Sequence, residues 1–184
     1  MRIRTFFTTL AIGAMMMTNA PGAAAAEPQN TLYMNLKDGR VVIQMLPEVA
    51  PKHVERIKEL VRADFYDGLT FHRVIDGFMA QSGDPKGDGT GGSGTKLPAE
   101  FSNAPFIRGT VGMARSQNPD SGDSQFFIMF APAPHLNGQY TVWGQVVDGM
   151  EHIDQIKKGD ARSNGTVNSP DRIVSMELAP DVNP

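Results

Sequence analysis

Short runs of alternating apolar and polar residues fill most of this chain, and a period of two is typical of β-strands with one buried face. The first two runs, residues 31–36 and 40–46, flank Asp38-Gly39, a dipeptide that favours a hairpin turn. Six further strands are expected at residues 70–75, 78–82, 110–114, 125–130, 141–147 and 171–178. The pattern therefore predicts a mainly β chain.

Two segments have the period of a helix instead. Pro51 suits a first helical position, and the helix that it begins runs to Arg62. Its apolar stripe consists of Val54, Ile57, Leu60 and Val61. A shorter helix is expected at residues 150–157, where Ile153 and Ile156 share a face. About eight strands with only two helices predict a closed barrel whose open ends the helices cover, and closure leaves no exposed sheet edge.

The N-terminal segment has the order of a secretory signal peptide. Arg2 and Arg4 precede an apolar run at residues 6–17, and small residues follow up to Ala26. The apolar run is shorter than the roughly 20 residues that cross a membrane. We therefore expect a signal peptide at residues 1–26, a single mature domain at residues 27–184, and a periplasmic protein with no membrane association after processing.

The composition argues against several classes of protein. A formal net charge of −3 gives no reason to expect nucleic acid as a partner. The chain has no cysteine, which excludes disulfides and a thiolate nucleophile. The four histidines, His53, His72, His135 and His152, lack the spacing of metal ligands, and no Gly-x-Ser-x-Gly elbow is present. Neither a metal nor a cofactor is expected.

The glycine-rich residues 83–95 partly match a phosphate-binding loop and a calcium loop. They end in the order Gly-Thr-Lys where the phosphate loop has Gly-Lys-Thr, and Lys86 and Thr95 occupy positions of calcium ligands. We therefore interpret the segment as a mobile surface loop whose glycines would let a bound peptide backbone approach. Asp120 and Asp123 are interpreted as solvated loop acids.

Arg73 is the most informative residue, because it stands within an apolar β-run. A guanidinium does not lose its charge, so in dry surroundings it is either a structural ion-pair partner or the working group of a site. Large apolar residues nearby and in other strands are expected to be plain core: Phe71, Ile75, Phe126, Ile128 and Trp143.

Five segments resemble the cyclophilins in both type and order. They are residues 71–84, 89–92, 111–115 and 124–128, and residues 135–138 followed by 142–144. The resemblance covers nearly all of residues 32–178. It implies an eight-stranded antiparallel barrel capped by two helices, peptidyl-prolyl cis-trans isomerase activity, and the bacterial periplasmic branch of the family.

The resemblance also implies the site. Arg73, Gln81 and Phe127 are the catalytic residues that it indicates, with Arg73 at the prolyl nitrogen. The substrate-binding residues are Phe78, Met79, Ala114, Arg115, Gln125, His135, Leu136 and Tyr140. The nitrogen of a planar amide accepts almost no hydrogen bond, whereas that of a twisted amide does, so a donor placed there favours the transition state.

The expected partners are Xaa-Pro segments of unfolded or partly folded exported proteins, bound by a monomer. A proline-peptide binding module or holdase that uses the same groove without turnover is the alternative. In many cyclophilins a Trp stands in place of His135, a His in place of Tyr140 and an Asn in place of Arg115. We expect weak cyclosporin binding from His135, an aromatic wall from Tyr140, and a change of groove charge alone from Arg115.

The turn at residues 76–77 conflicts with this site. A two-residue hairpin would pair Ile75 with Phe78, so that Met79 and Gln81 would point away from Arg73. The site needs these side chains together, which predicts a bulge, strong twist or bend in this hairpin.

Overall fold

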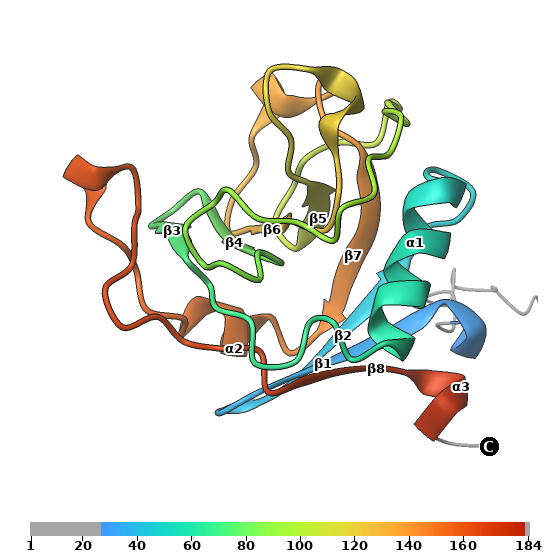
Figure 1. Cartoon of the computed structure of the whole chain (residues 1–184), viewed down its shortest axis with the longest axis horizontal. Coiled ribbons are helices and arrows are strands. Elements are labelled where there is room, and N and C mark those ends of the chain that lie inside the picture. The colour runs from blue at the N-terminus through green and yellow to red at the C-terminus, as the bar shows by residue number, and fades with distance from the viewer. Residues whose placement is uncertain (1–26, 183–184) are drawn as a thin grey trace, which may run out of the picture.

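The computed structural model describes residues 27–182, whose eight strands form one antiparallel sheet (Figure 1). The strands are β1 (Thr31–Leu36), β2 (Gly39–Met45), β3 (Arg73–Ile75), β4 (Met79–Ser82), β5 (Thr110–Met113), β6 (Phe126–Met129), β7 (Val142–Asp148) and β8 (Ser175–Leu178). Their spatial order is β3-β4-β6-β5-β7-β2-β1-β8. The predicted signal peptide lies outside the described residues and stays a prediction.

The predicted eight-stranded antiparallel fold is confirmed, and the sheet curls until the segments that precede its two end strands meet. Regular pairing leaves β3 and β8 as the ends of the sheet. The segments just before them are joined by irregular bonds: the Phe71 N–H donates to Asp171 O and the Ile173 N–H to Leu69 O, both at 2.9 Å. The strands expected at 70–75 and 171–178 are therefore shorter, because their first residues form this seam.

The helices largely follow the prediction. They are α1 (Pro51–Arg62), α2 (Met150–Asp154) and α3 (Ala179–Val182), with 3-10 turns η1 (Pro28–Asn30), η2 (Pro119–Ser121), η3 (Pro134–Leu136) and η4 (Ala161–Ser163). In Figure 1, α1 and α2 lie toward opposite ends of β1 and β2. The prediction that α2 extends to 157 is wrong, because the Lys157 N–H leaves the helix and donates to the Asp171 carboxylate at 2.8 Å. Within the described part of the chain, no helix has the length and apolarity to cross a bilayer.

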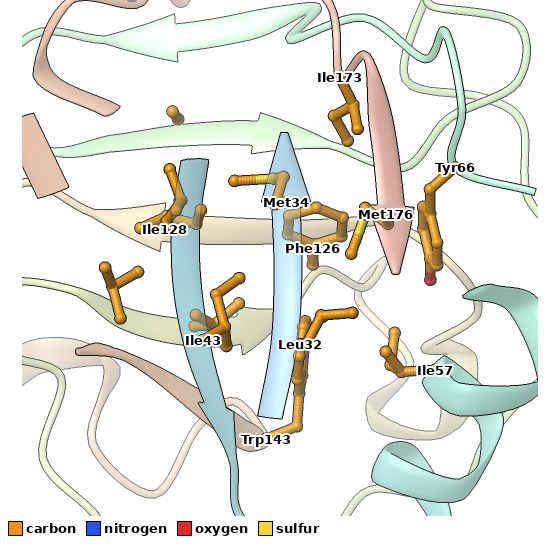
Figure 2. Close-up of a cluster of buried hydrophobic side chains, with 14 of the residues drawn as sticks. Leu32, Met34, Ile43, Ile57, Tyr66, Phe126, Ile128, Trp143, Ile173 and Met176 are labelled. Carbon is orange, nitrogen blue, oxygen red and sulfur yellow. The ribbon is translucent and has the colours of Figure 1, made fainter. Parts of the chain in front are cut away.

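Two apolar clusters lie on opposite faces of the same strands. The interior cluster fills the curl of the sheet, where Figure 2 shows side chains of β1, β2, β6 and β8 meeting, with Ile57 of α1 to one side. The outer cluster consists of Met79, Phe106, Phe127, Met129, Ala133, Leu136 and Val142. Of the expected core residues, Phe71, Phe126, Ile128 and Trp143 are fully buried. Ile75 is only partly buried and packs against the outer cluster, so its assignment to the core was wrong.

The β3–β4 hairpin has a three-residue loop, which corrects the predicted two-residue turn. Phe78 belongs to this loop: its N–H donates to Ile75 O at 3.0 Å, and its carbonyl accepts from Phe130 N–H at 2.9 Å. The strand register pairs Arg73 with Gln81, Val74 with Ala80 and Ile75 with Met79. The extra residue supplies the distortion that the implied site requires, because it places Arg73, Met79 and Gln81 on the outer face of the sheet.

Candidate active site

Arg73 is held by neutral oxygens on two sides. Its Nη1 donates to Gln81 Oε1, and its Nε and Nη2 donate to the backbone oxygen and Oδ1 of Asn164, all at 3.0 Å. Among residues 27–182, no carboxylate forms an ion pair with Arg73, so the structural ion-pair interpretation is wrong. A guanidinium has five N–H donors. Oxygens of the protein accept from three of them and Met79 Sδ lies 4.0 Å from Nη1, which leaves one donor for a ligand.

In the part of the chain that the structure describes, no acid lies within ion-pair distance to compensate the charge of Arg73. Partial burial lowers the pKa of Arg73, and Tyr140 opposes this effect. An arginine begins so far above neutrality that it keeps its proton at physiological pH. The site thus presents a permanent, partly dehydrated cation at its rim.

A relay of amide side chains fixes the orientation of this cation. Gln125 Nε2 donates to the carbonyls of Gly89 (3.0 Å) and Gly91 (2.8 Å), which leaves its Oε1 to accept from Gln81 Nε2 at 2.9 Å. Gln81 must then present its own Oε1 to Arg73. Each amide has one orientation that satisfies its neighbours, so the glycine-rich loop sets the position of the guanidinium.

A cavity of about 160 Å³ opens beside Arg73 on the outer face of the sheet. Met79, Phe127 and Leu136 are at most 8% exposed and form its apolar part. The complete lining is Arg73, Phe78, Met79, Gln81, Ala114, Arg115, Phe127, Leu136 and Tyr140. The structure thus brings together most of the site residues expected from the sequence, although their roles stay predictions.

Gln125 and His135 lie beside this cavity and do not line it. Gln125 lines a second cavity of about 320 Å³, which shares Gln81, Ala114 and Arg115 with the first. The exposed ring of His135 stacks on Phe78, with centroids 5.9 Å apart and planes 25° apart. Each of the two residues therefore contacts a residue that lines the pocket, Gln81 for Gln125 and Phe78 for His135.

Arg115 lines both cavities and packs against Tyr140, and its expected effect on the charge of the groove stays a prediction. Its guanidinium carbon lies 4.5 Å from the ring centroid of Tyr140, and its Nη2 donates to Gln139 O at 2.8 Å. Tyr140 in turn packs edge-on against Phe127, with centroids 5.7 Å apart. As expected, Tyr140 forms an aromatic wall.

Two buried carboxylates organise the glycine-rich residues 83–95. Asp84 is 1% exposed and accepts from the N–H groups of Lys86 (2.8 Å), Asp88 (3.1 Å) and Gly89 (2.6 Å). Burial alone would raise the pKa of Asp84, but these backbone donors outweigh it and lower the pKa. The loop is on the surface as expected, and it is tied to a fixed internal anchor.

Asp123 anchors the other end of the loop, so its interpretation as a solvated acid is wrong. It is 5% exposed and accepts from Ser93 N–H at 2.6 Å and from Lys96 Nζ at 3.2 Å. A Cβ at Gly92 would lie 2.7 Å from the Asp123 carboxyl carbon, so this close approach requires glycine. Asp120 is exposed, as expected. Within residues 27–182, no group of three or more histidines and acids is placed to hold a metal.

Asn164 is the site residue that the sequence analysis missed. It precedes Gly165, and both have positive φ, at 55° and 80°. The Asn-Gly dipeptide is a turn signal that the sequence does display. Its hydrogen bond with Arg73 joins residues that are 91 positions apart, so no local sequence pattern predicts it.

The fold and the pocket together define a class, a small protein whose curled eight-stranded antiparallel sheet carries an apolar socket beside a fixed cation. A sequence profile of the family described as "Cyclophilin type peptidyl-prolyl cis-trans isomerase/CLD" matches residues 31–178, and the chain belongs to this family. Its activity is accordingly peptidyl-prolyl cis-trans isomerisation, which decides against a binding module without turnover.

Relatives agree with this assignment. The chain is 54% identical over 187 residues to the "Probable peptidyl-prolyl cis-trans isomerase" of Brucella suis biovar 1, covering 95% of this chain and 93% of that protein. It is 44% identical over 133 residues to peptidyl-prolyl cis-trans isomerase B of Bacillus subtilis, covering 71% of this chain and 92% of the relative.

Solved structures show the same fold. The cyclophilin AquaCyp293 of Hirschia baltica matches with a TM-score of 0.77 at 26% identity, over 86% of this chain and 77% of that one. A Cryptosporidium parvum cyclophilin, crystallised in the presence of the dipeptide Ala-Pro, matches with a TM-score of 0.73 at 27% identity, over 80% and 98%.

Proposed function

We propose that Arg73 catalyses isomerisation by donating a hydrogen bond to the prolyl nitrogen as the Xaa-Pro amide twists. The observation that carries this proposal is the guanidinium itself, which stands at the rim of the 160 Å³ cavity without an anionic partner among residues 27–182. A purely structural arginine would be expected to pair with an acid.

The chemistry requires little else. The uncatalysed barrier of about 18–20 kcal/mol reflects the partial double bond of the amide. When the amide twists, the nitrogen lone pair becomes an acceptor, and a donor already aimed at it stabilises the transition state more than either planar isomer. A rate gain of about 10⁵ corresponds to roughly 7 kcal/mol from this hydrogen bond and from positioning together. No proton is transferred and no covalent bond forms.

The apolar part of the cavity is proposed to hold the proline ring. Met79, Phe127 and Leu136 offer apolar contact surface, and Met79 adapts its shape to the ring. The Cryptosporidium relative with the Ala-Pro dipeptide supports a proline-containing ligand here. The substrates are then Xaa-Pro segments of unfolded or partly folded chains.

The proposed setting is the periplasm, where the enzyme would act on exported proteins. Arg2, Arg4, the apolar residues 6–17 and the small residues before Glu27 support this proposal. Intact-mass analysis of the protein isolated from its native envelope fraction tests it: the expected N-terminus is Glu27 or a residue close to it. Retention of residues 1–26 would contradict export.

An isomerisation assay on short Xaa-Pro peptides tests the role of Arg73. We expect Arg73→Ala to lower kcat/KM about 100-fold or more, with unchanged thermal stability and peptide affinity, because the lost interaction exists only in the transition state. Arg73→Lys should also be impaired, since an ammonium lacks the planar fork that Gln81 and Asn164 orient.

Arg62→Ala is the control. Arg62 is exposed on α1 and pairs with Asp181 at 3.1 Å, away from the cavity, so its loss should leave turnover unchanged. Wild-type kcat/KM in Arg73→Ala would overturn the proposed mechanism.

A further inference from the structure

A loop at residues 159–166 is paired to the outer edge of β3, next to Arg73. Val74 N–H donates to Gly165 O at 2.8 Å, and Gly159 N–H donates to Val74 O at 2.9 Å. Both backbone groups of Val74 are therefore engaged by the loop, and Figure 1 shows the loop beside β3, in orange-red. Asn164 is held at a fixed place along the strand, one residue from the paired Gly165.

The backbone at this place restricts which residue can serve. Asn164 has φ 55°, in the left-handed region that Asn, Asp and Gly adopt at low cost. Of these three, Gly has no side-chain acceptor and Asp would bring a negative charge against Arg73. Of the three, only Asn combines the left-handed backbone conformation with a neutral side-chain oxygen that can accept from Arg73.

The side chain of Asn164 serves Arg73 and nothing else among the described residues. Its Oδ1 accepts from Arg73 Nη2, while its backbone oxygen accepts from Arg73 Nε. The loop has its own supports, since Gly165 N–H donates to Asp160 O at 2.9 Å and Arg162 N–H donates to the Asp160 carboxylate at 2.8 Å. Asn164 is exposed, so its amide adds nothing to the core.

We propose that Asn164 is a positioning residue for the isomerase reaction: it fixes the plane of the Arg73 guanidinium from the side opposite Gln81 without neutralising its charge. An Asp in its place would hold the Arg73 guanidinium equally well. Its negative charge would, however, weaken the N–H donor of Arg73 that must act on the prolyl nitrogen. This inference rests on the proposed role of Arg73.

Asn164→Gly tests it, because glycine keeps the positive φ and the backbone acceptor and removes only the amide. We expect kcat to fall about 5- to 50-fold with KM within twofold of wild type, since misorientation affects the transition state more than peptide binding. Exchange NMR on an Ala-Pro peptide gives the two constants separately, and the melting temperature should not change. Unchanged kcat would overturn the proposal.

Ser169→Gly is the matched control. Ser169 is exposed, has φ 53°, and is not among the hydrogen-bond partners of Arg73. The Ser169→Gly variant shows what a glycine does at a nearby position with positive φ, and it should leave kcat and KM unchanged.

Asn164→Asp keeps the geometry and adds a negative charge, so its kcat should also stay well below wild type at pH 7. Wild-type turnover in Asn164→Asp would refute the requirement for a neutral acceptor.

A double-mutant cycle separates this inference from the proposed role of Arg73. In an Arg73→Ala background, Asn164→Gly should change kcat/KM less than twofold, because Asn164 acts only through Arg73. An equal loss in both backgrounds would overturn the positioning role. If Arg73→Ala itself retained full activity, the proposed mechanism would fail first, and the single-variant data would show which of the two had failed.

Discussion

Phe126 and Phe127 are neighbours on β6, yet they belong to different clusters. Phe126 is 0% exposed and packs edge-on against Tyr66 and Trp143 inside the barrel. Phe127 is 6% exposed and stacks on Phe106 in the outer cluster, where a cavity remains beside it. The two residues are equally apolar and nearly equally buried. What distinguishes the core from the site is whether the apolar surface is covered on every side.

Truncation of the two rings should give the largest effects and separate the clusters. Phe126→Ala should lower the free energy of unfolding by about 3–5 kcal/mol, because it leaves a cavity in closed packing. Phe127→Ala should cost less stability, since its ring already borders open space, and should lower kcat/KM more. Urea unfolding and the isomerisation assay on both variants measure this. Equal stability losses with equal activities would show that the two clusters do not differ in role.

A second substitution sharpens the comparison at the rim of the outer cluster. His135→Trp should tighten cyclosporin binding by about 1–3 kcal/mol, because an indole adds apolar area and a donor next to Phe78. Turnover of small peptides should hardly change, since His135 does not line the cavity. Inhibition titrations of wild type and His135→Trp with cyclosporin test this prediction. The His135→Leu variant adds apolar area without an indole donor, so it separates the two contributions. Equal inhibition of wild type and His135→Trp would contradict the prediction.

Acid should lower the free energy of unfolding through His72, a histidine beneath the glycine-rich loop. His72 is 6% exposed, and neither ring nitrogen has a hydrogen-bond partner among the described residues. Burial lowers the pKa of His72; Asp84, the nearby backbone of Thr70 and Asp88 oppose this, and Arg73 adds to it. Below about pH 6.5 the unfolded chain binds a proton that the folded chain does not, so the free energy of unfolding should fall as pH decreases from 7 toward 5.

Urea unfolding across this pH range measures the effect. His72→Leu should reduce the slope, whereas His135→Gln, at an exposed site, should preserve it. A slope that is unaltered in His72→Leu would assign the acid sensitivity to another group.

The catalytic activity should not depend on pH in this way, and this is the smallest effect expected. At temperatures where the protein stays folded, kcat/KM should be flat between about pH 6 and 8, because Arg73 keeps its proton throughout. EDTA should leave the activity unchanged. A bell-shaped profile or inhibition by the chelator would indicate a titrating or metal-dependent step.

The sequence predicted features that depend on neighbouring residues. Alternation located all eight strands, and the stripe from Val54 to Val61 located α1, because these patterns are local. The β3–β4 register could not be predicted this way, since the loop includes Phe78, whose carbonyl is paired with Phe130. Asp123 was misjudged because its donors come from a loop 30 residues away. Asn164 was missed for the same reason, 91 residues from Arg73.

The loop at residues 159–166 has a consequence for the release of client chains. An unfolded polypeptide carries unpaired N–H and C=O groups and can join any open sheet edge as an added strand. Val74 offers no such edge, because the loop already occupies both of its backbone groups. The contacts proposed for a client, one proline ring and a few polar groups, would then gain no strand pairing at this edge. We expect short residence on the enzyme, so that one molecule can serve many prolines in turn.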